Sequence, residues 1–229
     1  MKKKRKWWKW VLGAVLLLVI AAAAAAIHIL GIFAPGNSSR YSLKNVEPLA
    51  DSPLAGKKIV FLGSSVTAGM GSLGTSFVDY LEKMDGIVAV KEAKSGTTLV
   101  DEDDSSYVSC LEDVNENAVD ALVVQLSTND ATRDKPLGEI SDSRQREDFD
   151  TSTIIGAMEA IIARANERWG CPVIFYTGTW FDNELYGEMV EALYKLQEKW
   201  GIDEIHPTRQ GYLEWWTPVI RQRLCEILG

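Results

Sequence analysis

The chain has 229 residues, of which 46% are hydrophobic and 24% charged, a composition that excludes a disordered or collagen-like protein. Its formal net charge is −8, although six of its 24 basic residues lie in the first nine positions and no acidic residue precedes Glu47. The remainder is therefore strongly acidic, which argues against nucleic acid as a partner because it repels phosphate backbones. The three cysteines form no CxxC pair and no zinc-spaced cluster with histidine, so we expect no metal site.

The chain begins with a predicted membrane anchor. Residues 11–34 carry no charge, and as a helix they would span about 36 Å, enough for a hydrocarbon core of about 30 Å. Residues 1–10 are basic and contain three tryptophans, so the positive-inside rule places this segment in the cytoplasm and the rest of the chain outside it. We predict a single-pass protein of the cell membrane. A cleaved signal peptide is the alternative, because the alanine run 21–26 offers small-residue cleavage sites.

The rest of the chain consists of a linker and one domain. Residues 35–56 are rich in Pro, Gly, Ser and Asn without a period, which is typical of a linker, and the domain covers residues 57–229. Short apolar runs predict strands at 57–63, 87–90, 120–126 and 172–177. Helical periodicity predicts helices at 75–84, 152–169, 184–200 and 210–228, with a polar loop at 134–150. This alternation favours an α/β fold with a mostly parallel sheet covered on both faces.

Candidate functional residues follow the first three strands, where ligands bind in such sheets. Ser65 lies in a tight strand-to-helix turn, which can expose a nucleophile beside the N–H groups of a helix start. Gly96 follows the second strand, where the lack of a side chain lets a backbone N–H approach a ligand. Asn129 follows the third strand, and its amide can donate a hydrogen bond to an oxyanion.

A candidate base lies near the C-terminus. His206 is the only histidine outside the predicted anchor, so it is the one imidazole available to activate a serine. Asp203 precedes it by three residues and could accept a hydrogen bond from its Nδ1–H, which would leave Nε2 facing the serine. We therefore expect Ser65, Asp203 and His206 to work together.

Four sequence blocks in chain order resemble the SGNH (GDSL-type) hydrolase family. They are FLGSSVTAG (61–69), AKSGTT (93–98), LSTND (126–130) and DEIHPTRQGY (203–212), and the resemblance covers about residues 57–227. The last block is the most specific of the four and the second is the least. The resemblance implies a flavodoxin-like three-layer α/β/α sandwich that hydrolyses acyl esters without a metal or cofactor.

The resemblance also implies a role for each residue. Ser65 would attack the ester carbonyl, His206 would take its proton and later protonate the leaving group, and Asp203 would orient His206. The oxyanion hole would consist of the Ser65 and Gly96 amides and the Asn129 side chain.

The chain departs from the family pattern in three places. Ser64 stands where the family usually has Asp, and Ser127 replaces the usual Gly of the third block. Only Gly201 and Ile202 separate the helix predicted to end at residue 200 from Asp203. Two residues span at most about 7 Å, so we expect the strand that the family has here to be missing or the chain to be a shortened form.

The predicted function is a membrane-anchored serine esterase that cleaves short acyl esters, such as acetyl esters, of cell-surface carbohydrate or lipid. Two alternatives use the same fold: a non-catalytic extracytoplasmic binding domain, and an acyltransferase that acts on a surface glycan.

A third alternative is dinucleotide binding, since residues 69–74 read GxGxxG and Glu92 follows about 20 residues on. We disfavour it because the first glycine lies six residues past the predicted strand end, whereas a dinucleotide-binding turn begins almost at it.

Overall fold

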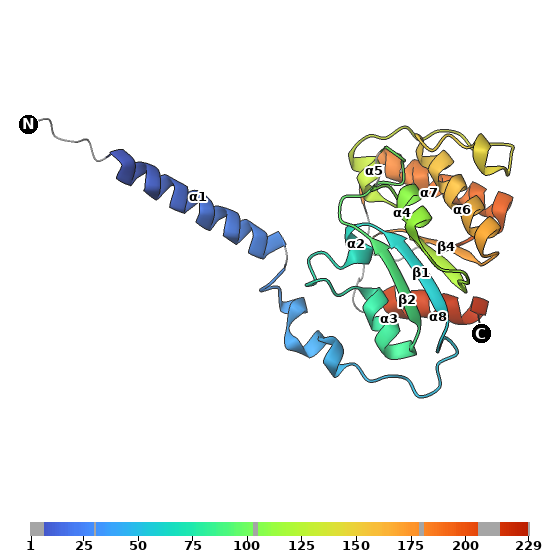
Figure 1. The fold of residues 1–229 in the computed structure, drawn as a ribbon, viewed down its shortest axis with the longest axis horizontal. Helices are drawn as coiled ribbons and strands as arrows, with labels where there is room; N and C mark the ends of the chain where they lie inside the picture. The colour runs from blue at the N-terminus through green and yellow to red at the C-terminus, as the bar shows by residue number, and fades with distance from the viewer. Residues whose placement is uncertain (1–6, 30, 103–104, 179–180, 206–215, 229) are drawn as a thin grey trace, which may run out of the picture.

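The centre of the protein is a five-stranded parallel sheet in the order β2-β1-β3-β4-β5 (Figure 1). The computed structural model describes residues 7–29, 31–102, 105–178, 181–205 and 216–228. The strands are β1 (Lys58–Gly63), β2 (Val88–Ala93), β3 (Ala121–Gln125), β4 (Val173–Tyr176) and β5 (Asp203–Ile205). This strand order is that of flavodoxin-like doubly wound sheets, as predicted.

Successive residues of each strand point into two different cores. In β1, Ile59 and Phe61 pack on one face of the sheet, whereas Val60 and Leu62 pack on the other. The first face is covered by α3 (Phe77–Asp85) and α8 (Trp216–Leu228). The second face is covered by α4 (Tyr107–Asp113), α6 (Ile154–Arg168) and α7 (Glu184–Trp200). The molecule is therefore the predicted three-layer α/β/α sandwich, with near-continuous apolar strands because both faces are buried.

The predicted elements agree with the structure except near the site and around β5. The helix predicted at 184–200 is α7 itself, and the predicted strands and the helices at 75–84 and 152–169 differ by a few residues at their ends. The helix predicted at 210–228 is seen as α8 from residue 216, and residues 210–215 lie outside the described residues. Three short helices were not predicted as such: α2 (Ser65–Ala68), α4 and α5 (Thr128–Thr132). The loop predicted at 134–150 contains only one 3-10 turn, Arg146–Asp148, among its described residues.

The expectation of a missing strand was wrong. Asp203–Ile205 is itself the fifth strand and pairs with β4 in the register Ile174–Asp203 to Tyr176–Ile205. Gly201 ends α7 in the left-handed conformation (φ 67°), and buried Ile202 then leads directly into β5. The chain thus needs only two residues to pass from helix to strand, because the strand takes up the first residues of the fourth block.

The N-terminal helix α1 (Trp7–Ile29) projects away from the sandwich (Figure 1). It begins earlier than the predicted span 11–34, so the three tryptophans belong to the helix. An 18-residue stretch of it has a mean hydropathy of 2.7, and none of it is buried in the sandwich, so it is long and apolar enough to cross a membrane. A signal sequence at this position would have the same properties.

The linker lies against the sandwich rather than extending as a free stalk. It forms three 3-10 turns, Pro35–Asn37, Ser39–Tyr41 and Leu43–Asn45. Asn37 Nδ2 donates a hydrogen bond of 2.7 Å to the carbonyl of Gly71, and the Tyr80 hydroxyl donates to the carbonyl of Tyr41. Further along, the Leu49 amide donates to the Met84 carbonyl at 2.8 Å. These contacts attach the linker to α3 and to the loop that precedes it.

Candidate active site

Ser65 is the first residue of α2, directly beyond the carboxyl end of β1. The strand ends at Gly63, Ser64 is the helix N-cap, and Gly69 ends the helix in the left-handed conformation (φ 81°). Gly63 has to be a glycine, because a Cβ there would lie 1.9 Å from Thr67 Oγ1. Ser64 and Thr67 are buried whereas Ser65 is partly exposed, so the turn presents Ser65 at the surface of the carboxyl edge.

A buried hydrogen-bond network holds this turn from beneath. Gln125, the last residue of β3, accepts hydrogen bonds through Oε1 from the Ser64 amide (3.0 Å) and from Thr67 Oγ1 (2.8 Å). Its Nε2 donates to Ser64 Oγ at 2.9 Å, and the Tyr176 hydroxyl of β4 lies 2.5 Å from Thr67 Oγ1. Ser64, at the position where the family usually has Asp, is therefore a buried partner of Gln125. Sequence reasoning missed Gln125, although a lone polar residue in the apolar run 121–126 was a visible signal.

The turns that follow β2 and β3 are hydrogen-bonded to each other and to the end of β1. Asn129 Nδ2 donates to the Thr97 carbonyl at 2.7 Å, and Arg133 donates to the Gly96 carbonyl at 2.7 Å. The Lys94 amide donates to the carbonyl of Gly63 at 3.3 Å, and the Thr97 hydroxyl donates to the Lys94 carbonyl at 2.8 Å. Gly96 has a φ of 89°, which a residue with a side chain rarely adopts. The structure thus brings Ser65, Gly96 and Asn129 to one edge of the sheet, as predicted from their positions after strands.

Ser127, which replaces the usual Gly, caps the short helix α5 that carries Asn129. Its Oγ accepts hydrogen bonds from the Asn129 amide (3.2 Å) and the Asp130 amide (3.4 Å). Ser is a favoured N-cap residue because its hydroxyl satisfies the free N–H groups of a helix start. This departure from the family pattern therefore has a local structural reason.

Asp130 holds the loop that follows Gly96, a role that sequence reasoning did not assign. Its carboxylate is fully buried and accepts hydrogen bonds from the Leu99 amide (2.8 Å) and the Val100 amide (3.1 Å). Burial raises the pKa of the Asp130 carboxyl above its usual value, and the hydrogen bonds that it accepts oppose this shift.

The three turns leave hydrogen-bond donors at the edge where Ser65 lies. Neither the Ser65 amide nor the Gly96 amide donates to an acceptor within the described part of the chain. The Asn129 amide has two hydrogens, of which one is used in the bond to Thr97. A cluster of such donors is the feature that stabilises an oxyanion in acyl transfer.

The structure places the backbone of Asp203 but not the rest of the predicted acid–base pair. Asp203 is the first residue of β5, opposite Ile174, and the strand ends at Ile205, opposite Tyr176. The carboxyl end of β5 at Ile205 therefore lies at the same edge of the sheet as those of β1, β3 and β4. His206 and the side chain of Asp203 lie outside the described residues, so the Ser65–His206–Asp203 triad stays a prediction.

The described residues offer neither a metal cluster nor a dinucleotide-binding turn. Within them, no group of three or more His, Cys, Asp or Glu side chains could hold a metal ion. The GxGxxG segment 69–74 lies between α2 and α3, away from the end of β1, so its glycines do not form the strand-to-helix turn of a dinucleotide site.

Comparison with known proteins identifies the fold. No protein-family model and no curated protein matches the chain. Among solved structures, a protein from Lactobacillus plantarum has a TM-score of 0.60 at 20% identity and covers 76% of this chain and 97% of its own. A candidate GDSL-like lipase from Bacteroides ovatus has a TM-score of 0.60 at 18% identity, covering 75% of this chain and 99% of its own.

The chain has the SGNH (GDSL-type) hydrolase fold. A family two carbohydrate esterase from Cellvibrio japonicus is similar as well, with a TM-score of 0.56 at 14% identity over 76% of this chain and 62% of its own. These identities are low, so the similarity extends to the SGNH fold and not to a particular substrate.

Proposed function

We propose that this protein is a serine ester hydrolase with Ser65 as its nucleophile. One observation carries the proposal: Ser65 starts a helix at the carboxyl edge of the sheet, where backbone and side-chain hydrogen bonds join the end of β1 to the turns of Gly96 and Asn129. The solved structures named as GDSL-like lipases and carbohydrate esterases support hydrolysis at the level of the fold.

In the proposed mechanism, the Ser65 hydroxyl attacks the ester carbonyl while His206 accepts its proton. The oxyanion accepts hydrogen bonds from the Ser65 and Gly96 amides and from the free Asn129 hydrogen. His206 then protonates the leaving alkoxide, and Asp203 holds the imidazole in the required tautomer. Water hydrolyses the acyl-enzyme by the same steps in reverse order. Each oxyanion donor contributes on the order of 10²–10³ in kcat in enzymes of this kind.

The proposed substrate is an acyl ester of surface carbohydrate or lipid, and the proposed location is outside the cytoplasm. The apolar helix α1 and the basic segment before it support a single-pass anchor with a cytoplasmic N-terminus. The acidic composition of the remaining chain makes nucleic acid an improbable partner. No cofactor takes part in this mechanism.

Turnover of p-nitrophenyl acetate by the full chain in mild detergent tests the proposal. We expect hydrolysis by the wild type and a loss of at least about 10³-fold in Ser65→Ala, which removes the nucleophile, and in His206→Ala, which removes the base. A Ser152→Ala variant, altered at an exposed serine just before α6 and outside the site, serves as the control and should keep wild-type turnover. A wild type that binds acetylated glycans but hydrolyses no ester would point instead to the non-catalytic binding domain. Transfer of the acyl group to a glycan rather than to water would identify an acyltransferase.

A further inference from the structure

A large groove lies beside Ser65, between the linker and the sandwich. Its volume is about 2100 Å³, and Ser65 forms part of its wall. The other walls are the linker turns, the loop that joins α2 to α3, and the facing sides of α3 and α8. Many of the side chains that line it are apolar; they include Val66, Met70, Leu73, Phe77, Met84 and Cys225.

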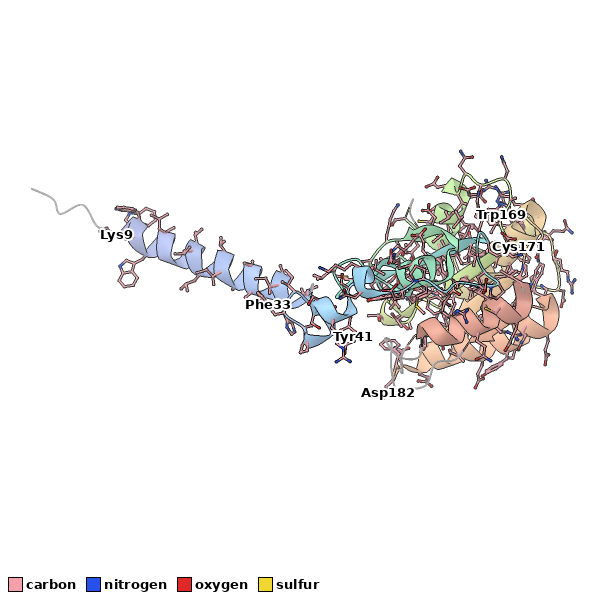
Figure 2. All side chains as sticks on the ribbon, turned by 90° about the horizontal axis from the view of Figure 1, so that it is seen from below. Lys9, Phe33, Tyr41, Trp169, Cys171 and Asp182 are labelled. Carbon is pink, nitrogen blue, oxygen red and sulfur yellow. The ribbon has the colours of Figure 1, made fainter. Side chains whose placement is uncertain are left out.

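The exposed apolar side chains of the sandwich and linker concentrate at this groove. Outside α1, eight large hydrophobic residues are exposed among those described, and four of them line the groove: Tyr41, Leu49, Met70 and Leu73. Two more, Ile32 and Phe33, follow α1 directly, and Figure 2 shows Phe33 and Tyr41 at the junction between α1 and the sandwich. Clustered exposed apolar side chains mark a binding surface for another apolar molecule.

Leu73 is the most informative of these residues. It is 57% exposed and adopts a φ of 57°, a left-handed conformation that favours Gly, Asn or Asp over Leu. An apolar side chain in this position gains nothing from the fold of the isolated protein, because it is neither buried nor in a preferred conformation. Contact with an apolar ligand in the groove would offset both costs.

The groove is held next to the end of the membrane helix. Asn37 Nδ2 donates hydrogen bonds of 2.7 Å both to the Gly31 carbonyl, two residues after α1, and to the Gly71 carbonyl in the groove wall. Gly31 and Gly71 approach so closely that a Cβ on Gly31 would lie 2.2 Å from the Gly71 carbonyl oxygen. If α1 spans a membrane, the groove opens at the surface of the bilayer that contains it.

From these observations we infer that the groove binds one acyl chain of a membrane lipid and presents its ester carbonyl to Ser65. This inference rests on the proposed function and selects a substrate class for it: a long-chain ester that resides in the membrane. The apolar walls replace the lipid environment of the chain, so transfer of the chain into the groove exposes little hydrocarbon to water. The anchor keeps the groove at the depth where such esters lie.

Photochemical cross-linking tests binding separately from catalysis. The full-chain Ser65→Ala protein is placed in nanodiscs of phosphatidylcholine and phosphatidylglycerol that contain phosphatidylcholine with a diazirine at the end of one acyl chain. After irradiation, peptide mass spectrometry should find adducts in residues 66–84 and 221–228 as well as on α1. Leu73→Asp in the same background should reduce the groove adducts and leave those on α1 unchanged. The matched control is Tyr194→Asp, which changes an exposed aromatic residue of α7 outside the groove.

Chain-length preference tests the same groove through the reaction. In the wild type, kcat/KM should rise by at least about tenfold from the acetyl to the dodecanoyl p-nitrophenyl ester, since each buried methylene adds binding energy. Leu73→Asp should remove most of this rise, and Asp tolerates the left-handed conformation of the loop. Tyr194→Asp, which lies outside the groove, should keep both the rise and the wild-type acetyl turnover.

The outcomes separate this inference from the proposed function. Adducts confined to residues 7–34, or acetyl turnover with no preference for longer chains, would overturn the acyl-chain groove and leave the esterase proposal standing. Groove adducts in a protein that hydrolyses no ester would support the groove and contradict the esterase.

Discussion

Gln125 holds the nucleophile turn from beneath through one buried side-chain amide. It is 1% exposed, and its single amide group is hydrogen-bonded to Ser64 and to Thr67, the residues on either side of the Ser65–Val66 pair. Buried polar groups cost free energy unless they are paired, so this network stabilises one conformation of the turn.

Replacing Gln125 by Leu should therefore reduce both stability and activity. The substitution leaves the Ser64 amide and Thr67 hydroxyl without this acceptor, which should lower the free energy of unfolding by about 1–3 kcal/mol. It should also lower kcat for p-nitrophenyl acetate more than it raises KM. The reason is that the substitution shifts Ser65 and leaves the residues that bind the acyl group in place. Thermal unfolding and steady-state kinetics in mild detergent measure the two effects. The exposed Gln145→Leu is the control, and equal effects in both variants would contradict the role of the network.

The raised pKa of Asp130 predicts that the stability of the protein depends on pH in a specific way. Because burial raises its pKa above the usual 3.8, the folded protein binds a proton more readily than the unfolded chain does. Protonated Asp130 therefore favours the folded state, so its contribution to the free energy of unfolding is largest at low pH. That contribution falls as the pH rises through the raised pKa of Asp130. Relative to Asp130→Asn, which carries no charge, the wild type should gain stability between pH 7 and pH 4. Melting temperatures of both proteins across this range measure the difference, and a constant or reversed difference would contradict the assignment.

At the scale of elements, a buried ion pair joins α6 to α7. Glu159 is fully buried and accepts hydrogen bonds from Lys199 Nζ (2.6 Å), Trp200 Nε1 (3.1 Å) and the Ser141 amide (2.9 Å). Lys199 also donates to the carbonyls of Ser141 and Ser143, so the pair fixes the loop 134–150 on these helices. The loop is ordered by this ion pair although it contains almost no regular structure.

Lys199→Met should destabilise the protein by about 3–5 kcal/mol, because it leaves the Glu159 carboxylate buried without its cation. The double variant Glu159→Gln/Lys199→Met should recover part of this loss, since the buried charge is then gone as well. The control is Arg146→Met, which removes an exposed partner of Glu112 while Arg164 remains, and it should cost less than about 1 kcal/mol. Thermal unfolding distinguishes these cases, and equal losses in Lys199→Met and Arg146→Met would refute the buried-pair argument.

Local patterns predicted most elements, and the differences arise from non-local contacts. The apolar runs of β1, β3 and β4 and the periodicity of α7 are visible within a few residues, so these elements could be predicted. The strand β5 could not, because Asp203–Ile205 is too short to show a period and exists through pairing with β4. The positions of Ser65, Gly96 and Asn129 could be predicted because the carboxyl ends of parallel strands lie at one edge of the sheet. The apolar run around Gln125 marks it as a buried polar residue, but its partner Ser64 lies 61 residues away, and no local pattern identifies that partner.

At the scale of the whole molecule, α1 and the linker would determine how the site faces a membrane if α1 spans one. Figure 2 shows α1 extending from one end of the sandwich, whereas Trp169 and Cys171 lie at the opposite end. The linker contacts α3 and the groove loop, so the sandwich is attached to α1 beside the candidate site. This attachment would restrict Ser65 to substrates close to the bilayer.

The proposal that α1 is retained as a membrane anchor predicts the mass of the mature protein. Expressed in a bacterium, the chain should remain in the membrane fraction after a carbonate wash with its full mass of 25.4 kDa. A cleaved signal peptide would instead release a smaller protein, and cleavage after the alanine run 21–26 would be visible in its intact mass. Mass spectrometry of the washed membranes and of the soluble fraction decides between the two.

The central claim, that Ser65 is a nucleophile, is tested most directly by covalent labelling. The full chain in mild detergent is incubated with a fluorophosphonate, and the modified residue is identified by peptide mass spectrometry. We predict a single adduct on Ser65 that is absent in Ser65→Ala, strongly slowed in His206→Ala, and still formed by Ser64→Ala, the matched variant of the neighbouring buried serine. An unlabelled wild type, or an adduct that persists in Ser65→Ala, would contradict the account.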